Sequence, residues 1–416
     1  MRFGIMTLDE VEVRGKTVLC RVDINQPIDK QTGQLKSLAR VKASLPTLQE
    51  LSDKGARVVI LAHQGSDIEY QNYYTTAPHA AALSDLLGRP VGFIDDVCGP
   101  AAREAIRRLG DGQLLMLDNV RFCAEEQTLF EQSLRLNHQE QAKTELVRKL
   151  VPLADLYVND AFAAAHRDQP SLCAFQQLLP SVMGRLFEQE YTVVSSLMQQ
   201  PERPCVYVLG GTKVDDAFLM MRSVLDSGQV DAILTGGLVA NILLAAGGQH
   251  IGQGSLQYLK QTGNDQHLEE AGALLKRHAE RIQLPEDLAW VEDGKRREAA
   301  LQALPHDALA LDIGSHTAQR YAAVIQQART VFVNGPMGVF EEEATALGSQ
   351  LVWDALGQTP AHTVVGGGDS LSATAKFGKT GQISYLCTGG GALIRFLSGE
   401  ELPVVKALRQ AAGKFG

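Results

Sequence analysis

The stretch Cys205–Lys213, CVYVLGGTK, joins an apolar run to a glycine turn and a lysine. Similar runs recur along the chain, each followed by a polar or glycine-rich turn and then by a helical pattern, as in Val41–Leu51 and Ala318–Ala328. Alternating strands and helices indicate a parallel sheet, and continuously apolar strands are typical of sheets covered on both faces. The remaining expected strands are Thr17–Val22, Val58–Leu61, Leu114–Leu117, Leu156–Val158, Ala232–Leu234, Leu309–Leu311, Thr330–Val333, Thr363–Val365 and Ile383–Cys387.

The chain has 416 residues, enough for two domains with separate cores. A polar helical segment at Met183–Gln199 leads into the proline-rich turn QQPERP at 199–204, which is typical of a linker. We therefore expect an α/β fold of two Rossmann-like domains, each a parallel β-sheet with helices on both faces. The predicted domains are residues 1–180 and 204–395, joined by an interdomain helix and hinge at 181–203.

Composition and missing motifs exclude several functions. With 39 Lys and Arg against 48 Asp and Glu, the formal charge is −9, which disfavours nucleic acid as a partner. The most apolar stretch, 232–246, is too short and interrupted to span a membrane. Six scattered cysteines without a C-x-x-C pair predict reduced thiols and a cytoplasmic protein. No Walker A loop, strand–G-x-G-x-x-G–helix, H-E-x-x-H or G-x-S-x-G motif is present.

The residues that follow the strands differ between the two halves. Ligands of open parallel sheets bind beyond the carboxyl ends of the strands. In the first half, these ends and the adjacent helix start carry cations and hydrogen-bonding groups that suit a small, highly anionic molecule. This set is Arg21, Asp23, Asn25, Arg40, His63, Arg121, His166 and Arg167.

In the second half, the corresponding positions carry glycines, a lysine and an aspartate. Glycine turns would let backbone N–H groups and helix N-termini approach phosphates. Asp369, after the triple glycine 366–368, suits a Mg²⁺ ion that bridges phosphates. Each residue alone has an ordinary explanation, as a surface charge, a structural histidine or a tight turn. Their clustering at the strand ends is what predicts a phosphoryl transferase.

At this point the motif RVDINQP (Arg21–Pro27) resembles the opening motif of the phosphoglycerate kinase family. Further motifs of that family follow in order along nearly the whole chain, and the AHQG and AFAAAHR forms resemble its archaeal branch. The matching motifs are AHQG (62–65), LDNVRF (117–122), VNDAFAAAHR (158–167), LGGTKV (209–214), NGPMGVFE (334–341), GGGDS (366–370) and TGGGA (388–392).

The resemblance implies a reversible phosphoryl transfer in glycolysis and gluconeogenesis, between 1,3-bisphosphoglycerate and ADP, giving 3-phosphoglycerate and MgATP. It implies that the cationic set of the first half binds phosphoglycerate and that residues 396–416 pack back on this domain. The implied nucleotide-binding residues are Gly210, Gly211, Lys213, Gly236, Gly237, Asn334, Pro336, Glu341, Gly367, Gly368, Asp369 and Ser370. The implied catalytic residues are Arg40, Lys213, Gly368 and Gly391, and Asp369 is the implied Mg²⁺ ligand.

Two departures from the family pattern leave alternatives open. Ser66 stands where the family carries an arginine, and Ala217 where it often carries a second lysine. One alternative is an enzyme of the same fold with a different acid as acceptor, and another is an inactive homologue that binds metabolites. Retention of Lys213, Arg40 and Asp369 argues against the second. The expected partners are small-molecule substrates, with neither nucleic acid nor membrane. A monomer is expected, and a dimer is left open.

Overall fold

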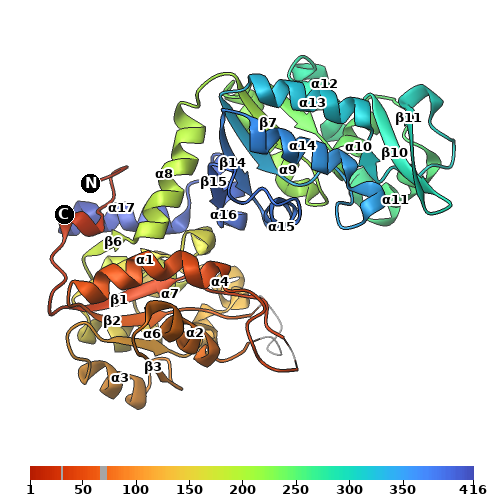
Figure 1. Ribbon diagram of the computed structural model, residues 1–416. Helices are drawn as coiled ribbons and strands as arrows, with labels where there is room; N and C mark the ends of the chain where they lie inside the picture. Colours follow the sequence, from red (N-terminus) through yellow and green to blue (C-terminus); the bar gives the residue numbers. More distant parts are fainter. Residues whose placement is uncertain (30, 66–72) are drawn as a thin grey trace. The chain divides into compact units, whose positions relative to one another are not determined.

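The computed structural model describes residues 1–29, 31–65 and 73–416 (Figure 1). They form two compact units, the first made of Met1–Val193 and Glu401–Gly416 and the second of Val194–Glu400. The boundary at Val193 falls inside helix α8 (Arg185–Gln199). In the described ranges, no helix is both long and apolar enough to cross a bilayer.

The first unit is built on a six-stranded sheet whose paired strands are all parallel. The predicted strands that begin at residues 17, 58, 114 and 156 are confirmed. The edge strands β3 and β6 were not predicted, because they are short. The order across the sheet is β3 (Val91–Ile94), β4 (Leu114–Leu117), β2 (Arg57–Leu61), β1 (Thr17–Val22), β5 (Leu156–Asp160) and β6 (Ser181–Met183).

Helices cover both faces of this sheet. Alternate residues of β1 face opposite sides, so that Val18 and Cys20 join one apolar cluster and Leu19 joins another. The first cluster includes residues of α1 (Ala39–Asp53) and α2 (Ala77–Leu87). The second includes residues of α3 (Pro100–Arg107) and α6 (Glu145–Leu150). The remaining helices of this unit are α4 (Thr128–Leu134), α5 (His138–Gln141), α7 (Pro170–Cys173) and the C-terminal α17 (Pro403–Phe415), which lies against β6 and α7.

The second unit contains another six-stranded parallel sheet, with β13 and β7 at its centre. Its order is β15 (Tyr385–Cys387), β14 (His362–Gly366), β13 (Thr330–Asn334), β7 (Cys205–Leu209), β8 (Ala232–Thr235) and β9 (Ile282–Gln283). On one face, Trp353 and Tyr321 are fully buried against strand residues of the same cluster. The helices are α9 (Val214–Asp226), α10 (Gly237–Ala246), α11 (Gln253–Gln261), α12 (Leu268–His278), α13 (Ser315–Gln327), α14 (Leu347–Gln358), α15 (Gly368–Lys376) and α16 (Gly390–Leu397).

A small antiparallel sheet of the second unit departs from the predicted pattern. Strands β10 (Asp287–Glu292) and β11 (Lys295–Ala300) form a hairpin, and β12 (Asp312–Ile313) pairs with β10. The turn residues Asp293 and Gly294 have positive φ of 49° and 70°, as an Asp-Gly hairpin turn requires. The predicted strand at Leu309–Leu311 is wrong, because this segment is unpaired until Leu311 donates one hydrogen bond to Ala289 O.

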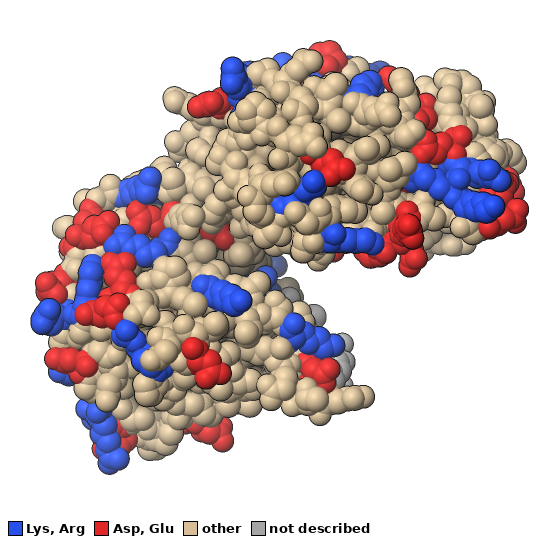
Figure 2. Space-filling model, in the orientation of Figure 1, with Lys and Arg blue, Asp and Glu red and all other residues tan. Residues whose placement is uncertain are grey.

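Charged side chains are mixed on the surface. On the face drawn in Figure 2, Lys and Arg alternate with Asp and Glu, without a broad patch of one sign among the coloured residues.

Candidate active site

The first unit brings its predicted groups together because they follow neighbouring parallel strands. Asp23 and Asn25 follow β1, His63 follows β2, and Arg121 lies in a short helical turn after β4. Asn119 caps that turn, its Oδ1 accepting from the N–H of Arg121. We call the six basic side chains of this region the basic cluster; its members are Arg21, Arg40, His63, Arg121, His166 and Arg167.

Arg21 lies fully buried within β1 and holds His63 in one tautomer. Its Nη2 is 3.0 Å from His63 Nδ1, and a guanidinium only donates, so Nδ1 accepts and the ring proton sits on Nε2. Burial, followed by the charges of Arg121 and Arg21, lowers the pKa of His63 well below 6.5. His63 is therefore a neutral imidazole in a cationic environment.

A converging pair of donors results from this tautomer. Asn25 Nδ2 is 3.4 Å from His63 Nε2, and both atoms carry hydrogen. The amide is oriented by Gly65, which accepts from Nδ2 at 3.2 Å and donates to Oδ1 at 3.1 Å. Two N–H donors side by side have no acceptor in each other, so they present a place for an anionic oxygen.

The arginines of the basic cluster differ in exposure. Arg121 is buried and donates to Gly65 O at 2.5 Å, which fixes the loop that follows β2. Arg40 is 34% exposed and forms a forked contact with Asp23, at 3.2 and 3.1 Å. Arg167 and His166 are half-buried in the loop after β5. Arg40 and Arg167 are thus placed to contact a ligand, while Arg21 and Arg121 shape the cluster.

Glu126 is a member of this region that the sequence pattern did not reveal. It is fully buried, and Ser171 links it to the cluster, since Ser171 N donates to Glu126 Oε1 and Ser171 Oγ accepts from Arg21 Nε. Burial raises the pKa of Glu126 to about 7, against the opposing effect of Arg21. Nothing in the local sequence AEE at 124–126 marks this carboxyl group as buried.

In the second unit, three helices begin beside one small cavity of about 60 Å³. These helices are α9, α15 and α16, and N–H groups of a first helical turn have no acceptor within the helix. With the helix dipoles they attract anions. The lining residues include Gly210, Lys213, Asp216, Asn334, Gly335, Gly367, Gly368, Asp369, Ser370 and Gly391.

The glycines after β7, β8 and β13 allow close packing of loop backbones, whereas the sequence predicted that their N–H groups face phosphates. A Cβ on Gly210 would lie 2.2 Å from Pro336 O, and one on Gly335, at φ +95°, would lie 2.0 Å from Gly210 O. The N–H groups of Gly210 and Gly211 donate to carbonyls of 334 and 336, and those of Gly236 and Gly237 donate to carbonyls of 209 and 337. The expectation that these four N–H groups face phosphates is wrong, because they join the loops to one another.

A second, larger cavity of about 250 Å³ adjoins the first and shares Gly211, Thr212 and Asp369 with it. Its walls are largely apolar, and its lining includes the predicted residues Gly237, Pro336 and Glu341. Gly236 lines neither cavity, since its neighbour is Met337. Lining residues that the sequence did not reveal are Leu238, Asn241, Ser255, Tyr258 and Phe340.

Asp369 is the carboxylate common to both cavities and is exposed in the first turn of α15. Within the described part of the chain, no hydrogen bond or ion pair occupies its carboxylate. A hard cation that keeps most of its water ligands suits such a single carboxylate. Lys213 is also exposed, and burial raises the pKa of Asp216 beside it. The fit to Mg²⁺ therefore rests on Asp369.

The loops of this site are tied together by two further predicted residues. Ser370 Oγ accepts from Gly335 N at 2.7 Å, and Asn334 Nδ2 donates to Gly366 O at 3.1 Å. Ala217, one of the two departures noted above, is fully buried and lines neither cavity. Ser66, the other departure, lies outside the described residues.

Comparison with known proteins agrees with this arrangement. The family model for phosphoglycerate kinase matches residues 8–400. This chain belongs to the phosphoglycerate kinase family. It is 44% identical to the phosphoglycerate kinase of Methanothermobacter thermautotrophicus, covering 98% of each chain, and 44% identical to that of Thermococcus kodakarensis, covering 96% of each. The resemblance to the archaeal branch is thus confirmed.

Solved structures of the family show the same fold. The crystal structure of phosphoglycerate kinase from Pyrococcus horikoshii has a TM-score of 0.90 at 40% identity, covering 99% of this chain and 100% of that one. The enzyme from Coxiella burnetii has a TM-score of 0.83 at 32% identity, covering 98% and 100%. The predicted pair of Rossmann-like domains is confirmed, and the activity is that of a phosphoglycerate kinase, a phosphotransferase with a carboxyl group as acceptor.

Substituting Glu126→Gln tests the buried carboxyl group. Between its ordinary pKa of 4.5 and about 7, folded Glu126 holds a proton that the unfolded chain has lost, so the free energy of unfolding falls as pH rises. We expect urea unfolding of the wild type to show a decline of at most about 3 kcal/mol from this group. Glu126→Gln keeps an oxygen for Ser171 N but cannot ionise, and should flatten the decline.

Glu125→Gln is the matched control, because Glu125 is the half-buried neighbour and accepts from Leu146 N. It should retain the wild-type dependence on pH. Equal slopes for wild type and Glu126→Gln would show that Glu126 ionises in the folded protein as it does in the unfolded chain.

Proposed function

We propose that the basic cluster of the first unit binds 3-phosphoglycerate and that the paired cavities of the second unit bind MgATP. The observation that carries this proposal is the sharing of Asp369 between an apolar cavity and a glycine-lined one. The apolar cavity suits an adenosine group. The glycine-lined cavity suits phosphates, because helix N-termini attract anions. This division assigns residues 1–180 to phosphoglycerate and 204–395 to the nucleotide.

The proposed phosphoglycerate site separates fixed from adjustable groups. Arg21 and Arg121 are buried and hold His63 and the loop at Gly65 in place. The N–H groups of His63 and Asn25 would donate to an anionic oxygen of the ligand, and Arg40 would leave Asp23 to form a forked contact. Ser66, which replaces an arginine of the family pattern, removes one cation from this set.

The proposed nucleotide site uses Asp369 to hold Mg²⁺ and Lys213 to contact the phosphates. The cation supplies neutralisation of the phosphate charge during transfer. Glu341, which lines the larger cavity, would accept from the ribose hydroxyls. The free N–H groups at the start of α15 and α16, including Gly368 and Gly391, would donate to the group in transfer.

The proposed chemistry needs no general base, because the carboxylate of 3-phosphoglycerate is already a nucleophile. Its oxygen attacks the γ-phosphorus in line, the bond to the β-phosphate oxygen breaks, and ADP leaves with the electron pair. Arg40 and Lys213 would stabilise the charge that develops on the transferring group. The acyl phosphate product is prone to hydrolysis, so the site has to exclude water during transfer.

A coupled assay with MgATP and 3-phosphoglycerate tests the assignment of the acid. We expect saturable turnover with 3-phosphoglycerate and much lower kcat/KM with other small carboxylic acids. A higher kcat/KM with another carboxylic acid would contradict 3-phosphoglycerate as the acceptor. Binding without turnover would support a metabolite-binding homologue.

Asp369→Asn tests the proposed Mg²⁺ ligand. The amide keeps the shape of the side chain but loses the charge, so we expect kcat/KM to fall at least about tenfold and the Mg²⁺ concentration for half-maximal rate to rise. Glu341→Gln, in the same cavity, is the control and should change KM for ATP while leaving the Mg²⁺ dependence unchanged. Wild-type Mg²⁺ dependence in Asp369→Asn would remove the proposed role.

Arg40→Ala tests transition-state stabilisation. We expect kcat to fall by about a hundredfold with a smaller change in KM, because the charge that Arg40 meets should be largest in the transition state. Arg57→Ala is the control, since Arg57 is an exposed arginine of the same unit paired with Asp111. A change in KM alone would assign Arg40 to ground-state binding.

Small-angle X-ray scattering tests closure of the hinge. The reaction joins a ligand of each unit, so the bound ligands have to meet with water excluded. Each ligand shifts the balance of conformations by its differential affinity for the closed form. We expect a modest decrease in radius of gyration with either MgATP or 3-phosphoglycerate and the largest with both. The same compact dimension with and without ligands would contradict hinge closure.

A further inference from the structure

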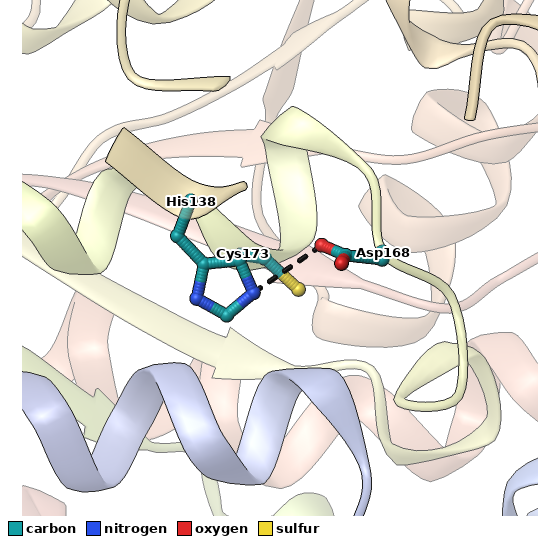
Figure 3. A group of neighbouring side chains, drawn as sticks. All are labelled: His138, Asp168 and Cys173. Carbon is teal, nitrogen blue, oxygen red and sulfur yellow. Dashed lines mark ion pairs between the residues drawn. The ribbon is translucent and has the colours of Figure 1, made fainter. Parts of the chain in front are cut away.

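Three potential metal ligands meet in the first unit, apart from the basic cluster. Figure 3 shows the side chains of His138, Asp168 and Cys173 turned toward one another. His138 begins α5, Cys173 ends α7, and Asp168 lies in the loop before α7. One ligand atom from each residue lies within 4.8 Å of the others, and His138 Nε2 is 3.3 Å from Asp168 Oδ1.

We propose that these three side chains form a binding site for a zinc-type divalent cation. Imidazole nitrogen, carboxylate oxygen and thiolate sulfur are the ligands that Zn²⁺ takes, with a water molecule in an open fourth position. Bond lengths of about 2.0 to 2.3 Å place tetrahedral ligands about 3.3 to 3.8 Å apart. The His138–Asp168 separation of 3.3 Å already meets this value, and Cys173 Sγ lies within 4.8 Å of both ligand atoms.

Cys173 is a protonated thiol until a cation enters. Its Sγ is 3.6 Å from Arg167 O, and burial raises its pKa well above the ordinary value, with Asp168 and Glu131 adding to the effect. A bound cation reverses this balance, because coordination removes the thiol proton and the positive charge offsets the nearby carboxylates. Binding therefore releases one proton to solvent and replaces the contact with Arg167 O.

The surroundings orient the proposed ligands. Gln141 Nε2 donates to Asp168 Oδ1 at 2.7 Å, and Asp168 N donates to Glu131 Oε1 at 2.7 Å. Gln141 Oε1 is buried and has no hydrogen-bond partner among the described residues, so the residue that holds Asp168 keeps an acceptor free. Such outer contacts strengthen metal sites.

A cavity of about 480 Å³ supplies the route to the site and is lined by His138, Asp168, Gln177 and Lys406. Cys173 is fully buried and is not among its lining residues, so a cation would reach His138 and Asp168 first. The Lys406 ammonium group in the lining opposes entry of a cation, whereas Glu131, which accepts from Asp168 N, favours it.

The experiment uses the full-length, chelator-treated protein without nucleotide, titrated with Zn²⁺ alone and, separately, with Co²⁺ alone. We expect one Zn²⁺ per chain, and a thiolate-to-cobalt charge-transfer band in the absorption spectrum. His138→Gln should weaken Zn²⁺ binding at least about tenfold, and Cys173→Ser should abolish the band. Cys205→Ser, which removes a buried cysteine of β7 in the second unit, is the control and should behave as wild type.

His138 has only 12% of its side chain exposed but lies at a helix end, so His138→Gln should fold even if Cys173→Ser does not. Thermal unfolding without metal checks that the variants are folded. Absence of the cobalt band from the wild type would overturn the proposal. So would a band of equal strength in His138→Gln and Cys173→Ser, or its loss in Cys205→Ser.

Discussion

A guanidinium group buried in the central region of a sheet is the constraint on which the first unit depends. Arg21 is fully buried in β1, and an uncompensated charge there would cost several kcal/mol. Its donors are met by Ser171 Oγ, Val22 O and His63 Nδ1, and its charge by Asp23 and, above its raised pKa, by Glu126. These partners lie in or after β1, after β2, after β4 and in α7, so satisfying Arg21 fixes these segments in one arrangement.

The second unit reaches a defined site by a different route. Gly210, Gly335 and Pro336 press backbone directly on backbone, with no room for a Cβ at either glycine. The N–H groups of the first loops are used in this contact, which leaves the N-termini of α15 and α16 as donors. Charged side chains therefore dominate the proposed phosphoglycerate site, which suits a compact acid. Backbone dipoles dominate the proposed nucleotide site, which suits a nucleotide whose charge is partly neutralised by Mg²⁺.

The sequence predicted those features that depend on local order along the chain. The central strands of the two sheets and the loops after β1, β2, β7 and β14 were predicted, because apolar runs and the residues after them are adjacent in sequence. The role of Asp369 after β14 stays a prediction. The hairpin β10–β11 was missed although Asp293-Gly294 is a recognisable turn signal. Its strand residues, such as Lys295–Glu298, are too polar to resemble the other strands.

Other features depend on contacts between distant residues and leave no local signal. Buried Glu126 accepts from the N–H of Ser171, 45 positions away, a contact that no local pattern indicates. Asn241 and Ser255 line the larger cavity because both contact the backbone of Ala310. Leu309–Leu311 resembles a strand in composition, yet it lies along that cavity and pairs only at its end. The role of glycines 210 and 211 was mistaken for the same reason, since their carbonyl partners lie more than a hundred residues away.

The contrast between a net charge of −9 and a concentrated basic cluster has a consequence for selectivity. Buried cations such as Arg21 and Arg121 act through the neutral donors that they orient, His63 and Asn25, and only Arg40 and Arg167 remain half-exposed. In the proposed site, a bulky polyanion would reach few of these groups, while a small acid that enters the cluster would reach most of them. The acidic exterior weakens long-range attraction for anions in general. Selection would therefore fall to short-range hydrogen bonding inside the cluster, where the fixed positions of His63 and Asn25 would discriminate by shape rather than by charge alone.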